Sequence, residues 1–168
     1  KGKKLPSRRK FFKAAAATGV AAVAASSLAA PAVAAERIEA SMVATWGRDF
    51  PGLGTGAQRF AQRIADISDG RIQVTYYAAN ERVKAFDSFD EVASGNSQMY
   101  HAADYYWVKK DPAWGYFTAV PFGFTYTEMN AWIRFAGGQQ LWDELADKFG
   151  LKNFMCGSTG VQMGGWFN

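Results

Sequence analysis

A glycine-rich loop over residues 46–56 constrains the fold of this chain most, because it joins a predicted strand to a predicted helix. The residues before it, 38–45, are mostly apolar or β-branched and predict a strand. The residues after it predict an amphipathic helix with Thr55 as its N-cap. Loops in this position are where open α/β domains hold small ligands. The apolar residues at helical spacing are Ala57, Phe60, Ala61, Ile64 and Ile67.

The rest of the chain continues this alternation of strands and helices. Each predicted element is short, and glycines separate many of them. Such alternation indicates an α/β layer built from parallel βαβ units. The predicted strands cover 71–77, 98–102 and 151–156, and the predicted helices cover 85–93, 128–135 (with Thr127 as N-cap) and 139–149.

The first 35 residues have the pattern of an export signal. Basic residues, among them the pair Arg8 and Arg9, precede an apolar run over 14–30, and small residues follow that run. This order is typical of a cleaved signal peptide, and paired arginines before Phe-Phe-Lys are typical of the twin-arginine pathway. A membrane anchor is the alternative, but short alanine-rich runs insert poorly. We therefore predict a twin-arginine signal peptide over 1–35 and delivery to the periplasm.

The signal accounts for the basic character of the whole chain. It holds seven of the 19 Lys and Arg residues and none of the 15 acidic ones, which leaves twelve basic against fifteen acidic residues. The isoelectric point near 9.2 therefore reflects the signal. The remaining residues are mildly acidic, so we expect no nucleic-acid partner.

The inventory of reactive side chains is small. His101 and Cys156 are the only histidine and cysteine. We therefore expect no disulfide framework, zinc cluster or Cys/His nucleophile pair, which argues against an enzyme. His101 lies in a predicted strand and is expected to be a hydrogen-bonded core residue. Asp104 and Asp111 are expected to be a cap and a turn residue rather than metal ligands.

The same loop does not fit a nucleotide site. Its glycines at 52, 54 and 56 lack the spacing of the dinucleotide-binding fingerprint. A plain connection and a carboxylate held near a helix N-terminus both remain open. Aromatic residues make up 15% of the chain, so most should fill a core while a subset could line a pocket. For Tyr105, Tyr106 and Trp107, at a predicted strand end, a core role and a ligand role are equally compatible with position.

Several multi-residue stretches resemble the extracytoplasmic solute receptors of tripartite ATP-independent periplasmic (TRAP) transporters. The resemblance is strongest to the branch that binds 2-oxo acids such as pyruvate, or lactate, together with a metal cation. It extends over nearly all of residues 36–168. The stretches are 46–56, 83–87, 102–107, 119–123, 128–132 and 159–167.

The resemblance implies a periplasmic binding protein-like, two-lobed α/β receptor that closes on an organic acid and delivers it to membrane permease subunits. Members of the family are longer than this chain, so residues 36–168 should be the N-terminal lobe and the start of the second. The arginine that clamps the substrate carboxylate is expected beyond Asn168. A homodimer, an exported enzyme acting on a small organic acid, and a sensory module without transport remain open alternatives.

The resemblance also implies roles for particular residues. Tyr105 and Tyr106 match tyrosines that face the substrate. Gln162 matches a position whose amide carbonyl binds both the substrate and a cation, sodium or calcium. Trp46 and Phe86 are the other predicted ligand-binding side chains, and Trp46 is the one expected to face the ligand from the glycine-rich loop.

Overall fold

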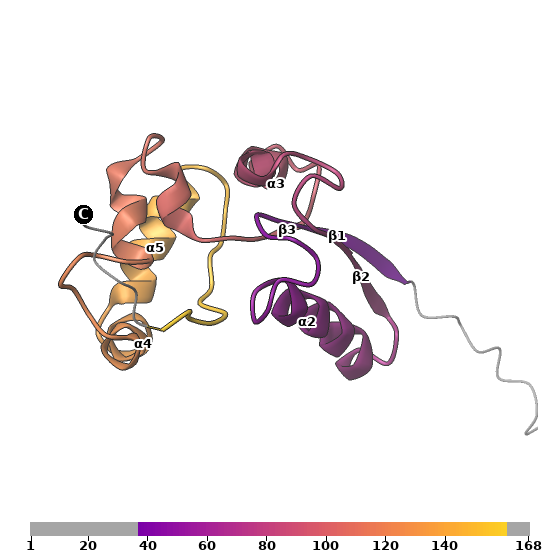
Figure 1. Ribbon diagram of the computed structural model, residues 1–168, viewed down its shortest axis with the longest axis horizontal. Coiled ribbons are helices and arrows are strands. Elements are labelled where there is room, and N and C mark those ends of the chain that lie inside the picture. Colours follow the sequence, from indigo (N-terminus) through magenta and orange to yellow (C-terminus); the bar gives the residue numbers. More distant parts are fainter. Residues whose placement is uncertain (1–36, 161–168) are drawn as a thin grey trace, which may run out of the picture. The chain divides into compact units, whose positions relative to one another are not determined.

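The computed structural model describes residues 37–160 of the chain (Figure 1). The chain divides into two units, residues 1–35 and 36–168, and every described residue belongs to the second. Arg8 and Arg9 of the predicted signal, and Gln162 of the predicted site, lie outside the described residues.

A three-stranded, all-parallel sheet organises the first part of the described chain. Its strands are β1 (Ile38–Ala44), β2 (Ile72–Tyr77) and β3 (Met99–His101), in the order β2-β1-β3. Ile38 pairs with Ile72 across β1 and β2, and Met42 pairs with Met99 across β1 and β3. These parallel pairings confirm the predicted βαβ arrangement. They also bring the carboxyl ends of all three strands to one edge of the sheet.

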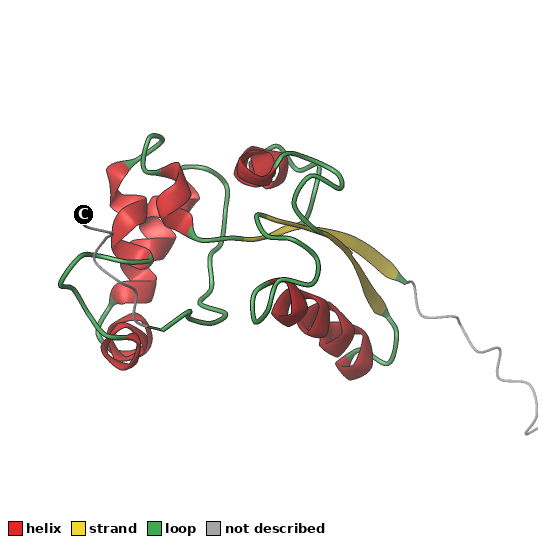
Figure 2. Ribbon diagram, viewed as in Figure 1, coloured by secondary structure: helices red, strands yellow, loops and turns green. Residues whose placement is uncertain are grey.

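Helices cover both faces of this sheet. Figures 1 and 2 show α2 (Gly54–Ile67) on one side and α3 (Ser88–Ala93) on the other. Ala57 and Ala61 of α2 are buried, whereas Phe60 and Ile67, part of the predicted apolar face, are exposed. The small alanine side chains therefore form the packed face of α2. The core beneath this helix contains Met42, Ala44, Ala57, Tyr76 and Ala78.

The prediction that Thr55 caps α2 is wrong. The helix begins at Gly54, and Thr55 lies in the first turn, where its hydroxyl accepts a bond of 3.1 Å from the Gly52 amide. Gly54 allows this early start because a Cβ there would lie 2.1 Å from the carbonyl oxygen of Gly47. The loop thus passes so close to the helix that only glycine fits.

The second part of the described chain packs short helices around a larger aromatic core. After η1 (Ala85–Asp87) and α3, the chain passes through β3 into the remaining helices. These are η2 (Asp104–Trp107), η3 (Pro112–Phe117), α4 (Tyr126–Phe135) and α5 (Gly138–Asp147). The buried residues of this core include Phe89, Trp107, Trp114, Phe117, Met129, Ile133, Trp142 and Leu145.

Two further predictions from the sequence, a helix cap and a strand, are wrong. Thr125, not Thr127, caps α4, because its hydroxyl and the Glu128 carboxylate form a reciprocal capping box. Residues 151–160 form neither helix nor strand, so the strand predicted over 151–156 is wrong. Buried and exposed residues do alternate from Leu151 to Phe154, but the buried Asn153 bonds to side chains instead of to a neighbouring strand. Within residues 37–160, no helix combines the length and apolar content that crossing a bilayer requires.

Candidate ligand-binding site

The carboxyl ends of β1 and β3 bring two distant aromatic segments together. The Thr45 amide donates to the carbonyl of His101 at 3.1 Å, which extends the pairing of the two strands by one residue. Trp46 therefore lies beside His101, with ring centroids 5.0 Å apart. The Ala79 amide, just beyond β2, donates to the carbonyl of Trp46 at 3.0 Å. Residues at or just beyond the ends of all three strands thus meet at Trp46.

Four of the five predicted ligand-binding side chains form one contact group at this edge. Tyr106 is its centre, with ring centroids 4.6 Å from Tyr105, 5.1 Å from Phe86 and 6.5 Å from Trp46. We call these four residues the strand-end aromatic group. Trp46, Tyr105 and Tyr106 are half-buried, and Phe86 is 61% exposed. The group therefore presents apolar rings and two phenol hydroxyls at a partly open edge.

The phenols of this group suit a negatively charged ligand. Burial, followed by the neighbouring Tyr106 hydroxyl, raises the pKa of Tyr105 to about 12. Tyr105 consequently keeps its proton at neutral pH and has an O–H to donate. A hydrogen bond from a neutral donor to a carboxylate is stronger than one between two neutral groups.

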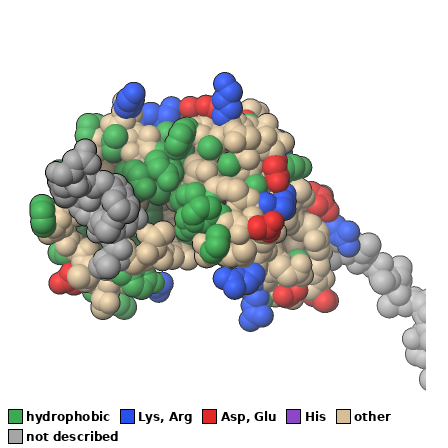
Figure 3. All heavy atoms as spheres, in the orientation of Figure 1, with side chains coloured by type: hydrophobic (Ala, Val, Ile, Leu, Met, Phe, Trp, Pro, Cys, Tyr) green, Lys and Arg blue, Asp and Glu red, His purple; other side chains and the backbone are tan. Residues whose placement is uncertain are grey.

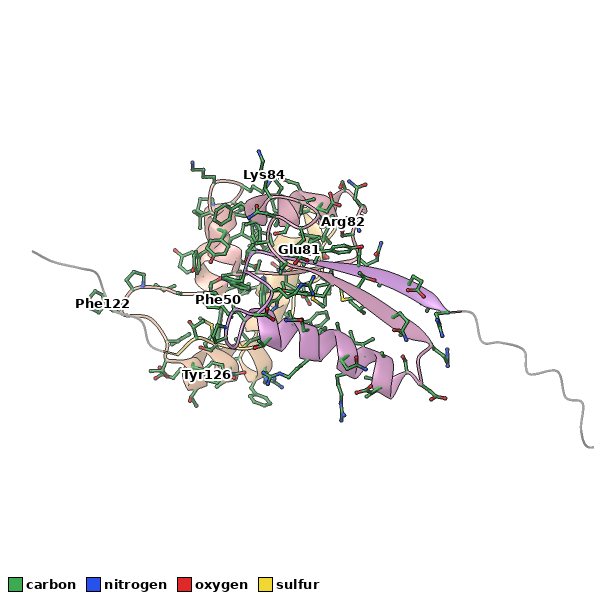
Figure 4. All side chains as sticks on the ribbon, turned by 45° about the vertical axis from the view of Figure 1, so that its right-hand side comes forward. Phe50, Glu81, Arg82, Lys84, Phe122 and Tyr126 are labelled. Carbon is green, nitrogen blue, oxygen red and sulfur yellow. The ribbon has the colours of Figure 1, made fainter. Side chains whose placement is uncertain are left out.

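An ion pair fastens the loops beside the group. Arg48, in the glycine-rich loop, binds Glu81 through its Nε at 2.9 Å and donates to the carbonyl of Tyr76 at 3.1 Å. Glu81 also accepts from the Ala78 amide at 2.9 Å. Figure 4 shows Glu81 and Phe50 near the carboxyl end of the sheet. These bonds hold the loops after β1 and β2 together next to Trp46.

A buried carboxylate lies directly before the two tyrosines. Asp104 is 5% exposed and makes no cap hydrogen bond, so its expected role as a cap is wrong. Its Oδ1 accepts from the Tyr100 hydroxyl at 3.1 Å. Its Oδ2 accepts from Trp142 Nε1 and from Asn153 Nδ2, both at 2.8 Å. By contrast, Asp111 accepts from the Ala113 amide at 2.9 Å, as expected of a residue in the turn before η3.

His101 and Cys156, which were expected to form no nucleophile pair, are in contact. Cys156 Sγ lies 3.4 Å from His101 Nδ1. Burial lowers the pKa of His101 and raises the pKa of Cys156. Both shifts favour neutral side chains at pH 7, whereas a cysteine nucleophile requires a thiolate. The two side chains therefore form a weak hydrogen bond beside Trp46, with Cys156 exposed, and lack the charge state of an activated nucleophile.

The acidic side chains near this edge do not cluster. Across residues 37–160, no group of three or more His, Cys, Asp or Glu side chains is arranged to hold a metal ion. Both oxygens of Asp104 already accept hydrogen bonds.

Two apolar hollows lie away from the strand-end aromatic group, over η3, α4 and α5. Their volumes are about 320 and 180 Å³, and both are bordered by Tyr116 and Trp132. Neither includes a residue of the strand-end aromatic group.

Figure 3 shows apolar side chains gathered in the middle of one face, with most charged side chains toward its edge. In Figure 4, Phe122 projects from the loop before α4, and its side chain is fully exposed.

Comparison with known proteins identifies relatives of one kind. Residues 43–167 match the DctP family, described as bacterial extracellular solute-binding protein, family 7. The chain is 36% identical over 126 residues to the monocarboxylate 2-oxoacid-binding periplasmic protein of Nostoc sp. (strain PCC 7120). That match covers 75% of this chain and 34% of the relative.

Two solved structures share the fold. One is a TRAP periplasmic solute-binding protein from Pseudoalteromonas atlantica with bound sodium and pyruvate, at 42% identity and a TM-score of 0.76. The other is a TRAP periplasmic solute-binding protein from Colwellia psychrerythraea with bound calcium and pyruvate, at 37% identity and a TM-score of 0.76. Each match covers 79% of this chain and 40% of the solved chain. The predicted periplasmic binding protein-like α/β fold is therefore confirmed, and the chain spans one lobe of it.

Proposed function

Because the chain belongs to the family of bacterial extracellular solute-binding proteins, family 7, we propose that the complete receptor binds a small monocarboxylate. The ligand class is a 2-oxo acid such as pyruvate, or lactate, bound together with a metal cation. The receptor delivers this acid to the membrane permease of a TRAP transporter and does not convert it chemically. Two relatives that share this fold hold pyruvate with sodium or calcium.

The observation that carries the proposal is the convergence of Trp46, Phe86, Tyr105 and Tyr106 at the carboxyl edge of the parallel sheet. Ligands of open α/β sheets bind at this edge. Aromatic walls exclude water, and the neutral Tyr105 phenol supplies a directed donor for the carboxylate. Closure of a second lobe over the edge would bury the acid and couple binding to the open–closed equilibrium.

The cation is assigned to ligands outside residues 37–160. Sodium and calcium prefer oxygen donors, which include amide carbonyls. We propose that the side-chain carbonyl of Gln162 is one ligand and also contacts the substrate. The remaining cation ligands, and the arginine expected to clamp the carboxylate, belong to the rest of the receptor.

The proposed location and partners follow from the sequence pattern. Residues 1–35, with Arg8 and Arg9, act as a twin-arginine signal, and the receptor works in the periplasm. Residues 36–168 form the N-terminal lobe and the start of the second. The receptor's partner is the integral-membrane permease, and pairing of two receptors remains a prediction.

Thermal unfolding of the complete receptor tests the proposal. Pyruvate at about 100 times its dissociation constant should stabilise the folded state by about 2.7 kcal/mol, which raises the Tm by several degrees. Removing sodium and chelating calcium should suppress this rise. Gln162→Ala should weaken the cation-dependent part while leaving the Tm of the unliganded receptor close to that of the wild type. No shift with any member of a panel of 2-oxo and 2-hydroxy acids would contradict the proposal.

A further inference from the structure

We propose that Asp104 is a positioning residue of the strand-end site. Its carboxylate fixes the turn that carries Tyr105 and Tyr106 to the segment that follows α5. The assignment rests on the proposed function, because it concerns how the ligand-facing phenols are held in place.

Three separate parts of the fold donate to this one carboxylate. Tyr100 comes from β3, Trp142 from α5, and Asn153 from the segment after α5. Asn153 Nδ2 also lies 2.6 Å from the Tyr100 hydroxyl, so two of the donors are linked to each other. Gln139 Nε2 then donates to the backbone carbonyl of Asn153 at 2.9 Å. Asp104 is therefore the point at which β3, η2, α5 and residues 151–156 are joined by polar contacts.

The carboxylate is buried without a positive partner. None of the ion pairs found within residues 37–160 includes Asp104. Burying an unpaired charge is costly, and hydrogen bonds from neutral donors must offset that cost. Both oxygens lose these bonds if the three donors move apart. The arrangement therefore resists displacement of η2 relative to α5 more strongly than apolar contacts alone would.

Because Asp104 is part of η2, its hydrogen bonds also restrain the two tyrosines that follow it in this turn. Tyr105 and Tyr106 follow it directly in the same 3₁₀ turn. A second restraint acts on the turn from the other side, because the Tyr105 amide donates to Thr118 Oγ1 at 3.2 Å. Loss of the Asp104 carboxylate should therefore loosen and re-aim the turn without unfolding it. Since its own oxygens are occupied, Asp104 acts through the tyrosines and does not itself touch the ligand.

Replacing the carboxylate by an amide in the complete receptor tests this role. Asp104→Asn keeps the shape but turns one acceptor oxygen into a donor, so at least one of the three existing hydrogen bonds is lost or reversed. We expect pyruvate affinity, measured by calorimetry well below the Tm, to fall about tenfold to a hundredfold, the size of loss that follows removal of a group that orients a metal-binding residue. Asp111→Asn is the matched control, since it makes the same carboxylate-to-amide change at the residue that caps η3. Its amide oxygen can still accept from the Ala113 amide, and only an exposed ion pair with Lys148 is lost, so the Tm of the unliganded receptor should stay close to that of the wild type and the affinity within about twofold of it.

The outcomes separate positioning from a merely structural role. An Asp104→Asn receptor with a lower Tm but wild-type affinity would overturn the proposal. If this variant does not fold, Tyr100→Phe removes one donor to Asp104 together with the acceptor for Asn153, and it should weaken pyruvate binding more than Tyr116→Phe does. Equal affinities of those two variants would also overturn the proposal.

A second measurement works without any ligand. Cys156 lies three residues after Asn153, in the segment that Asp104 holds. Alkylation of Cys156 in the unliganded receptor should be severalfold faster in Asp104→Asn and unchanged in Asp111→Asn. If the wild-type receptor binds no acid, the proposed function fails. The alkylation rate of Cys156 still shows whether Asp104 holds residues 151–156 in place, because it is measured without a ligand. Equal rates in both variants would contradict the positioning role.

Discussion

The described chain contains two aromatic groups of similar composition and different surroundings. The core group of Phe89, Trp107, Trp114, Phe117 and Trp142 is buried and packed among helices. The strand-end aromatic group is partly open and carries two phenol hydroxyls at the carboxyl edge of the sheet. Ring contacts of 4.6–6.5 Å occur in the strand-end group, and contacts such as Phe89–Trp107 at 5.1 Å occur in the core. Ring spacing alone therefore does not distinguish the partly exposed strand-end aromatic group from the buried core group.

Neighbouring residues of one turn divide between the two groups. Trp107 is buried, and its Nε1 donates to the carbonyl of Phe86 at 3.0 Å. Tyr106, one residue earlier, contacts Trp46 and Phe86 at the open edge. A 3₁₀ turn has three residues per turn, so successive side chains point in different directions. The short segment η2 therefore carries one residue of the core group and its neighbour in the strand-end aromatic group. The effects of a mutation in each group can be compared within this one segment.

The largest expected effect comes from the core group. Trp114 is fully buried, so Trp114→Ala should lower the free energy of unfolding by about 3–5 kcal/mol. Urea denaturation of the complete receptor measures this loss. The folded variant should still bind pyruvate with wild-type affinity at low temperature. A large loss of affinity would remove the distinction between the two groups.

The phenol hydroxyls should show the opposite behaviour. Tyr105→Phe and Tyr106→Phe keep the rings but remove the donors, so the free energy of unfolding should change by less than about 1 kcal/mol. Pyruvate affinity, measured by calorimetry, should fall about tenfold to a hundredfold, since hydrogen bonds to charged groups contribute about 1.5–3 kcal/mol. Tyr116→Phe, on η3, is the matched control. Wild-type affinity in both site variants would place these tyrosines outside the binding surface.

Much of the sheet could be predicted from the sequence because its signals are local. β-branched and alternating residues marked β1 and β2, and a short run after residue 97 marked β3. The residues at which helices begin were predicted less well. Thr125 and Thr127 both lie near the start of α4, and both residue types are common helix caps. The reciprocal pair of Thr125 and Glu128 decides between them, and its spacing is visible in the sequence.

The meeting of the strand-end aromatic residues could be predicted in part for a similar reason. Trp46 lies two residues after β1, and the tyrosines lie four and five residues after β3, so a parallel sheet brings them to one edge. The proposed role of Asp104 was missed because two of its three donors are distant in sequence. Trp142 and Asn153 are 38 and 49 residues away, and no local pattern connects them to Asp104. The alternation over 151–154 resembled a strand, although apolar packing buries Leu151 and the side-chain network buries Asn153.

The pH dependence of stability should report the raised pKa values of the partly buried tyrosines. The pKa of Tyr105 is raised to about 12, and burial also raises the pKa of Tyr100, which packs against the core group. A phenol with a raised pKa in the folded state stabilises that state fully below its ordinary pKa of about 10, and this contribution is lost as pH rises toward the folded value. Urea midpoints should therefore fall between about pH 10 and 12. Tyr105→Phe should flatten part of this fall, and an unchanged profile would contradict the raised pKa of Tyr105.

The smallest expected effect concerns a charge at the border of the core group. Lys110 Nζ lies 5.2 Å from the centre of the Phe89 ring and 2.6 Å from Asp90 Oδ1. Exposed ion pairs and exposed cation–ring contacts each contribute at most about 1 kcal/mol. Lys110→Gln should therefore cost about 0.5–1 kcal/mol in urea denaturation, with a smaller cost at high salt. Asp90→Asn breaks the ion pair but keeps the ring contact, so comparing the two variants separates the contributions. A loss above about 2 kcal/mol in Lys110→Gln would mean that Lys110 covers the core as packing, and the boundary of the core group would then extend beyond its aromatic rings.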